Sequence, residues 1–183
     1  TCFMVTVETL YSHYLQHPVV CTDSRQVTPG CLFFALKGEK FDGNLYAAKA
    51  ITDGAAFSVV SDPALEGQPG MLLVEDTLKA LQQLATFHRR KIQIPVIAIG
   101  GSNGKTTTKE LVSAVLSSHY PCYFTKGNFN NHIGVPLTLL SMPVNTEVAV
   151  IEMGANHPGE IDELCRIAEP THGLLTNIGK EHL

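Results

Sequence analysis

Short apolar runs alternate with helix-compatible segments along the 183-residue chain. Runs of this kind, too short for helices and bounded by turn residues, predict buried strands. In the first half of the chain they lie at 19–21, 31–36, 55–60 and 71–74. Helical spacing of apolar side chains predicts helices at 5–17 and from Asp76 or Thr77 onward. A further helix is expected at 44–53, closed by Gly54. The polar, glycine-bounded stretch 37–43 is expected to be a loop.

A second alternation begins after Gln93. Its predicted strands lie at 96–99, 122–125, 148–151 and 173–176, and its helices at 106–118, 134–140 and 158–168. Pro158 suits the first position of the last helix. Buried strands that alternate with helices indicate a doubly wound parallel sheet. The expected fold class is therefore α/β, with a small N-terminal domain at 1–93 followed at 94–183 by part of a second domain.

A glycine-rich loop follows the strand predicted at 96–99 and reads Gly-Gly-Ser-Asn-Gly-Lys-Thr. Strand, glycine-rich loop and helix start come in the order that a phosphate-binding loop requires, although Ile99 stands where the usual pattern has its first glycine. Lys105 can reach the β- and γ-phosphates, and the Thr106 hydroxyl can ligate Mg²⁺. The alternative is a glycine-rich turn that merely carries a lysine. We expect nucleotide phosphates to contact Gly101, Ser102, Asn103, Gly104, Lys105, Thr106 and Thr107.

Further polar residues follow two other predicted strands. Ligands of an open parallel sheet bind beyond the carboxyl ends of its strands. Glu152 stands directly after the strand at 148–151, where a carboxylate can bind Mg²⁺ beside the phosphates; an ordinary acid paired with a lysine is the alternative. The strand at 173–176 leads into Asn177 and, a few residues on, His182, whose position suits metal or substrate binding.

The segment 127–136 carries three asparagines and a histidine. Asparagine tolerates left-handed turn geometry, so a conformational role is open. Amides beside a phosphate site also hydrogen-bond polar substrates, and this is the interpretation we favour.

Composition narrows the class of protein. A net charge of -4 and a pI near 6.0 argue against a nucleic-acid-coating role. The basic run Arg89-Arg90-Lys91 is expected to be a solvated helix end. Five scattered cysteines without a C-x-x-C pattern indicate a reducing compartment, the cytoplasm. No apolar run is long enough to span a membrane, and both ends of the chain suggest a piece of a longer protein.

Three segments together resemble the Mur ligases: Gly-Ser-Asn-Gly-Lys-Thr-Thr, Gly-Asn-Phe-Asn-Asn-His-Ile-Gly-Val-Pro and Glu-Met-Gly-Ala-Asn-His-Pro-Gly-Glu-Ile. Upstream, Thr-Asp-Ser-Arg, Pro-Gly-x-Leu-Phe-Phe-Ala-Leu and Phe-Asp-Gly also match the N-terminal UDP-substrate domain of this family. The resemblance spans nearly the whole chain. The phosphate loop alone would also fit a folylpolyglutamate synthetase. The two asparagine-containing segments favour the branch of the family that adds D-alanyl-D-alanine.

The resemblance implies an ATP-dependent amide ligase of peptidoglycan synthesis, which activates UDP-N-acetylmuramoyl-tripeptide as an acyl phosphate and couples it to D-alanyl-D-alanine. ATP and Mg²⁺ are the implied cofactors, in a cytoplasmic monomer. Lys105 would stabilise the transferring phosphoryl group, Thr106 and Glu152 would hold one Mg²⁺, and His182 would help to hold a second. The implied substrate contacts are Thr22, Ser24, Glu39, Lys40 and Phe41 for the UDP moiety, and Asn128, Asn131 and His132 for the muramoyl peptide.

Other functions stay open at this point. Another Mur ligase, such as the diamino-acid-adding enzyme, and a non-catalytic nucleotide-binding module both fit the phosphate loop. The carbamylated lysine of the family and its C-terminal domain would lie after Leu183. We therefore expect this chain alone to lack ligase activity.

Overall fold

The structure, a computed structural model, describes residues 4–179. The chain divides between Phe87 and His88 into two compact units. The last part of helix α3 (Thr77–Lys91) thus belongs with the second unit. The domain boundary expected near Gln93 stays a prediction.

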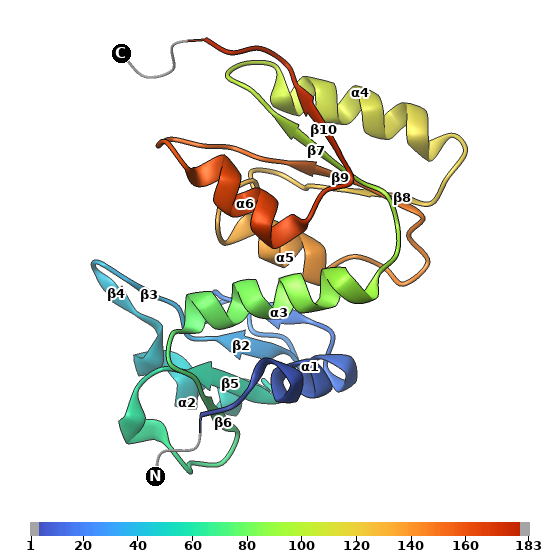
Figure 1. The fold of residues 1–183 in the computed structure, drawn as a ribbon. Coiled ribbons are helices and arrows are strands. Elements are labelled where there is room, and N and C mark those ends of the chain that lie inside the picture. The colour runs from blue at the N-terminus through green and yellow to red at the C-terminus, as the bar shows by residue number, and fades with distance from the viewer. Residues whose placement is uncertain (1–3, 180–183) are drawn as a thin grey trace. The chain divides into compact units, whose positions relative to one another are not determined.

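A parallel four-stranded sheet forms the centre of the first unit (Figure 1). In spatial order its strands are β1 (Val20–Cys21), β2 (Leu32–Phe34), β5 (Phe57–Val60) and β6 (Met71–Leu73). Successive side chains point to opposite faces of a strand. Phe57 contacts the ring of His13 in α1 (Val7–Gln16), whereas the Ser58 hydroxyl donates to the carbonyl of Ala47 in α2 (Ala47–Thr52). Helices α1 and α2 therefore cover opposite faces of this sheet.

The stretch 37–43, expected to be a loop, is instead a hairpin. Strands β3 (Lys37–Gly38) and β4 (Phe41–Asp42) pair antiparallel, and two residues make the turn. The prediction failed because strands of two residues, largely polar, show no apolar alternation. The helix expected at 44–53 is divided into a 3-10 turn, η1 (Gly43–Tyr46), and α2. A second 3-10 turn, η2 (Pro63–Leu65), lies between β5 and β6.

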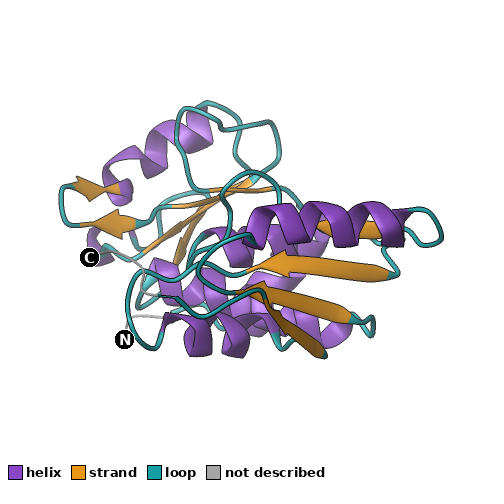
Figure 2. Ribbon diagram, turned by 90° about the horizontal axis from the view of Figure 1, so that it is seen from above, coloured by secondary structure: helices purple, strands orange, loops and turns teal. Residues whose placement is uncertain are grey.

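The second unit has its own parallel sheet. Its strands, in spatial order, are β10 (His172–Leu175), β7 (Val96–Gly100), β9 (Val148–Glu152) and β8 (Cys122–Phe124). Helix α4 (Lys105–Ser117) covers one face, and α5 (Gly134–Leu140) and α6 (Glu160–Ala168) cover the other (Figures 1 and 2). The predicted α/β class with parallel sheets is confirmed.

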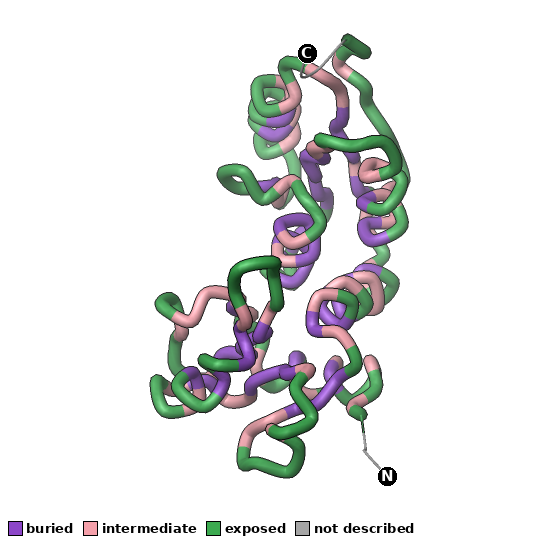
Figure 3. Tube along the Cα trace, turned by 90° about the vertical axis from the view of Figure 1, so that its left-hand side faces the viewer, coloured by how far each residue is buried: buried purple, intermediate pink, exposed green. Residues whose placement is uncertain are grey.

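The buried residues follow the strands and the inward sides of the helices, while the connecting loops are exposed (Figure 3). Every residue of β9 is buried, which explains its unbroken apolar run before Glu152. No helix in the described part of the chain is both long and apolar enough to cross a membrane.

Helix α6 begins later than expected. Pro158 was predicted at its first position, but the helix starts at Glu160, after Gly159 in a left-handed conformation with φ +92°. The Glu160 carboxylate accepts hydrogen bonds from the backbone N–H groups of Asn156 and His157, at 2.6 and 3.1 Å. Pro158 therefore lies in the turn before α6, and the hydrogen bonds to Glu160, the first residue of that helix, hold the turn in place.

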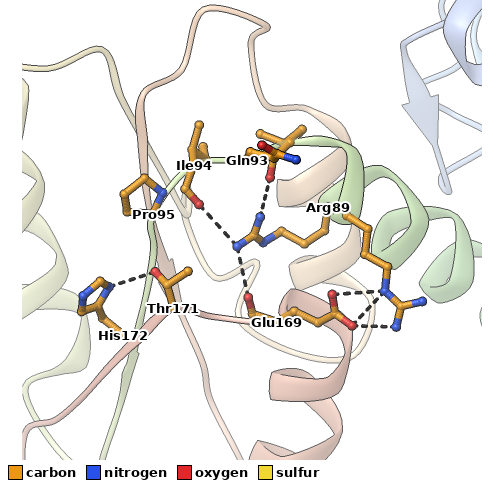
Figure 4. Close-up of a pocket in the computed structure, with 9 residues that line it drawn as sticks. Arg89, Gln93, Ile94, Pro95, Glu169, Thr171 and His172 are labelled. Atoms are coloured by element: carbon orange, nitrogen blue, oxygen red, sulfur yellow. Dashed lines mark hydrogen bonds and ion pairs between the residues drawn. The ribbon is translucent and has the colours of Figure 1, made fainter.

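Arg89 is buried, so the prediction of a solvated basic helix end is wrong for this residue. Its guanidinium donates to the carbonyl oxygens of Ile92 and Glu169 at 2.6 and 3.1 Å (Figure 4). It also donates to the carbonyl oxygen of Ala168 at 3.0 Å. The neighbouring Arg90 pairs with the Glu169 carboxylate at 2.6 Å. Arg89, Arg90 and Glu169 help to line an open pocket of about 500 Å³ at the amino ends of the strands, the opposite edge from the glycine-rich loop.

Candidate functional site

The glycine-rich loop connects the end of β7 to the start of α4. Gly101 has φ +124°, and a Cβ atom there would lie 2.2 Å from the Thr176 hydroxyl oxygen, so only glycine fits. Gly104 is the N-cap of α4 in a left-handed conformation, with φ +81°. The two glycines thus turn the chain sharply from the strand into the helix.

The segment after β10 supports this loop. The backbone N–H groups of Ser102 and Asn103 donate to the carbonyl and side-chain oxygens of Asn177, at 3.1 and 3.0 Å. The Thr176 hydroxyl donates to the Asn103 carbonyl at 2.6 Å. Asn177 therefore shapes the loop, and the N–H groups of Ser102 and Asn103 are engaged within the protein.

The start of α4 offers donors for an anion. No side chain caps this helix, and its first intrahelical bond runs from the Thr108 N–H to the Gly104 carbonyl. The first N–H groups of such a helix have no intrahelical acceptor, and the helix dipole favours negative charge there. The Lys105 ammonium donates to the carbonyl oxygens of Gly101 and Ser102, at 2.6 and 3.0 Å. The Lys105 ammonium and the first N–H groups of α4, which have no intrahelical acceptor, together make a phosphate site.

Glu152 connects this helix to the neighbouring strand. Its carboxylate oxygen Oε1 accepts from the Thr106 hydroxyl at 3.2 Å and from the Asn130 amide at 2.9 Å. Its backbone N–H donates to the Thr125 hydroxyl at 2.9 Å. The residue is 2% exposed, and its other carboxylate oxygen, Oε2, has no hydrogen-bond partner among residues 4–179.

A cation would satisfy the unpartnered oxygen. A buried carboxylate oxygen without a donor costs roughly 1–3 kcal/mol or more, which a bound metal ion would offset. Mg²⁺ prefers oxygen ligands, and it commonly takes one carboxylate and lets phosphates and water complete its octahedron. Glu152 and Thr106 fit this requirement. Within the described residues no three His, Cys, Asp or Glu side chains gather as a metal site, and magnesium with a nucleotide needs no such cluster.

The asparagine-containing segment 127–136 lies beside Glu152, and its side chains have different roles. The Asn131 side-chain oxygen accepts from the N–H groups of Ile133 and Gly134, at 3.1 and 2.9 Å, and so holds the turn that leads into α5. Asn131 and His132 also line a small polar pocket of about 80 Å³. Asn128 is exposed. The conformational role of Asn131 is therefore visible, while substrate contact by these three residues stays a prediction.

The residues expected to contact the UDP moiety lie in the first unit. Thr22 and Ser24 follow β1, and Glu39, Lys40 and Phe41 belong to the hairpin that follows β2. Because β1 and β2 are parallel neighbours, both groups follow the carboxyl ends of adjacent strands. The hairpin also carries an aromatic surface, since the exposed Phe41 ring stacks on Tyr46 with centroids 5.3 Å apart.

Sequence reasoning missed Asn130 and Thr125 as parts of this site, whereas Asn177 was expected at the end of the strand at 173–176. Asn130 stood among three asparagines, and nothing in the sequence distinguished it from its neighbours. Thr125 could have been noticed, because it is a hydroxyl residue that ends a predicted strand beside the strand of Glu152. His182 lies outside the described residues.

Comparison with known proteins identifies the family. Residues 99–183 match the Mur ligase middle domain, and residues 18–89 match the catalytic domain of the Mur ligase family. The chain belongs to the Mur ligase family.

Within this family, the chain is most usefully compared with the UDP-N-acetylmuramoyl-tripeptide–D-alanyl-D-alanine ligases, also named MurF. The Bacillus subtilis ligase of this name is 48% identical over 167 residues, which are 90% of this chain and 36% of the relative. A crystal structure of MurF from Acinetobacter baumannii superposes with a TM-score of 0.84 at 42% identity, covering 90% of this chain and 36% of that one. MurF from Thermotoga maritima, solved in complex with ADP, gives a TM-score of 0.81 at 33% identity, covering 90% and 38%. The chain thus spans little more than a third of the length of these relatives.

Proposed function

We propose that this chain is part of an ATP-dependent ligase that joins D-alanyl-D-alanine to UDP-N-acetylmuramoyl-tripeptide. The observation that carries the proposal is the Thr106–Glu152 hydrogen bond, at the uncapped start of α4, beside a buried carboxylate oxygen without a partner. A nucleotide phosphate at the helix and a cation at that oxygen use all of these groups together. The similarity to the D-alanyl-D-alanine ligases supplies the substrates.

In the proposed reaction the terminal carboxylate of the tripeptide attacks the γ-phosphorus of ATP, and ADP leaves. The amine of D-alanyl-D-alanine then attacks the acyl carbon, the bond to the phosphate oxygen breaks, and the amine loses a proton. The protein contributes mainly positioning and neutralisation of charge.

The residues of the second unit would divide this work. Lys105 exchanges its bonds to the loop carbonyls for phosphoryl oxygens, and the N–H groups at the start of α4 hold the neighbouring phosphate. Thr106 and Glu152 would hold Mg²⁺, which when bound shields the negative charge of the phosphates. We assign His182 to a second metal ion on the grounds of the family resemblance alone.

The first unit would hold the UDP end of the substrate. Thr22, Ser24, Glu39, Lys40 and Phe41 are the proposed contacts, with Lys40 as a partner of the pyrophosphate. Asn128, Asn131 and His132 are proposed to contact the muramoyl peptide. We expect this chain alone to bind nucleotide without turnover, because it matches only 36% of the length of a ligase relative.

Phosphate release by the full-length protein tests the reaction. The proposal predicts release that requires both UDP-N-acetylmuramoyl-tripeptide and D-alanyl-D-alanine. Release with UDP-N-acetylmuramoyl-dipeptide and a diamino acid would instead identify a different Mur ligase. Absence of release with every pair would contradict the assignment as a ligase.

Nucleotide binding can be tested on this chain separately. Lys105→Met is expected to weaken ADP binding by about tenfold or more, because a charge-assisted contact to phosphate is lost. Lys91→Met, at the exposed end of α3, is the matched control and should leave the affinity unchanged. Equal affinities of both variants and the wild type would contradict the phosphate role of the loop.

A further inference from the structure

A lysine is buried beside the site. Lys109 lies one turn after Thr106 on α4, and only 1% of its surface is exposed. Its ammonium donates to the Thr125 carbonyl at 2.9 Å and lies 2.8 Å from the carboxylate of Glu110. Burying an ammonium costs free energy, because the charge loses its hydration. An apolar side chain of similar length would fill the same space without this cost, so packing does not explain the lysine.

The contact to Thr125 leads directly to Glu152. Thr125 is fully buried, and its hydroxyl accepts from the backbone N–H of Glu152 at 2.9 Å. Its own backbone N–H donates to the Val150 carbonyl at 3.0 Å, which continues the pairing of β8 with β9. Thr125 thus accepts a hydrogen bond from Lys109 at its carbonyl oxygen and one from the Glu152 backbone at its hydroxyl oxygen.

Helix α4 therefore reaches Glu152 by two routes. Thr106 contacts the carboxylate directly, at Oε1. Lys109 acts on the backbone of the same residue through Thr125. A side chain that must present one free oxygen to a cation gains from support at both its backbone and its carboxylate.

We propose that Lys109 is a positioning residue for the metal site, where its buried ammonium fixes Thr125 and thereby the backbone from which Glu152 presents Oε2. The inference rests on the proposed function, because it takes the ligand of Oε2 to be the magnesium ion of a bound nucleotide. Lys109 itself touches neither the nucleotide nor the metal ion. Its loss should weaken the contribution of Mg²⁺ to nucleotide binding and spare the contacts that Lys105 and the start of α4 make with phosphate.

The test measures ADP binding to this chain by titration calorimetry with Mg²⁺ and with EDTA. The ratio of the two dissociation constants is the magnesium effect. In Lys109→Met the affinity in EDTA should stay within about twofold of wild type, and the magnesium effect should fall about tenfold. Ser113→Ala is the matched control, because Ser113 is buried one turn further along α4 and its hydroxyl has no partner in the described structure. It should leave both values unchanged.

A second variant tests the route through Thr125. Thr125→Val keeps the shape of the side chain but removes the hydroxyl that holds the Glu152 N–H, so it should lower the magnesium effect to a similar degree. If Lys109 acts through Thr125, the double variant should lose no more than either single one. Thermal unfolding of each variant identifies those that fold, and Thr125→Val decides the question if Lys109→Met does not.

The outcomes separate this inference from the proposed function. A wild-type magnesium effect that persists in folded Lys109→Met, or in Thr125→Val, overturns the positioning role alone. Losses that add up in the double variant overturn the route through Thr125. Absence of ADP binding by the wild-type chain overturns the nucleotide site, and the positioning role with it.

Discussion

The hydroxyl of Thr106 donates a hydrogen bond of 3.2 Å to Oε1 of Glu152, and so connects the first turn of α4 to the last residue of β9. The two residues are 46 positions apart in the sequence. They meet because β7, which leads into the loop before α4, is the parallel neighbour of β9 in the sheet. The strand order of the sheet therefore brings Thr106 and Glu152 together without a ligand.

The two loop glycines should differ in their tolerance of a side chain. Gly101→Ala is expected to cost about 1–3 kcal/mol of stability through backbone strain, with a further cost from the contact with Thr176, and to abolish ADP binding. Gly104→Ala meets no atom within 4 Å, so it should cost only the left-handed backbone penalty of about 1 kcal/mol. Urea unfolding followed by circular dichroism measures both. Equal costs for the two variants would contradict the described packing of the loop.

The two arginines at the end of α3 should also differ. Arg89→Lys removes donors from one buried and two partly buried carbonyl groups, and a buried carbonyl left without a partner costs about 1–3 kcal/mol. Arg90→Lys changes a largely exposed ion pair and should cost under about 1 kcal/mol. Urea unfolding at neutral pH compares them. A change as small in Arg89→Lys as in Arg90→Lys would show that the buried guanidinium does not support this unit.

Acid should weaken the second unit through Glu169. Hydrogen bonds from Arg90 lower the pKa of this carboxyl below its ordinary value of 4.5. Below that value the unfolded chain takes up the proton first, so the stabilisation is present at neutral pH and is lost as the pH falls through the lowered pKa. The side chain is 38% exposed, so the effect should stay under about 1 kcal/mol.

Glu169→Gln should therefore be less stable than wild type at neutral pH, and the difference should shrink as the pH falls below 4.5. Unfolding curves at a series of pH values measure it, with Glu147→Gln, an exposed carboxylate, as control. A difference that is constant over this range would exclude the ion pair as its cause.

The central residues of the site could be predicted from the sequence because each carries a local signal. Gly104, Lys105 and Thr106 follow an apolar strand in the order of a phosphate loop, and Glu152 ends another apolar strand. The rule that ligands bind at the carboxyl ends of parallel strands then brings them to one edge of the sheet. The contact between Thr106 and Glu152 agrees with that expectation.

The supporting residues could not be predicted, since their roles depend on contacts between distant segments. Lys109 resembles any helix lysine until the Thr125 carbonyl, just after β8, accepts its ammonium. Arg89 resembles a solvated helix end until carbonyls at the ends of α3 and α6 accept its guanidinium. Asn130 and Asn131 are distinguished only by the path of the loop: the Asn130 amide donates to Glu152, and the Asn131 side chain holds the turn that leads into α5. Local patterns contain no information about these choices.

The magnesium effect on ADP binding by wild type and Glu152→Gln tests the metal site most directly. The variant keeps the size of the side chain and removes the charge of the buried carboxylate. We predict that Mg²⁺ tightens ADP binding to the wild-type chain and has no effect on binding to Glu152→Gln, while both bind ADP equally in EDTA. An undiminished magnesium effect in Glu152→Gln would contradict the assignment of this carboxylate to the metal ion.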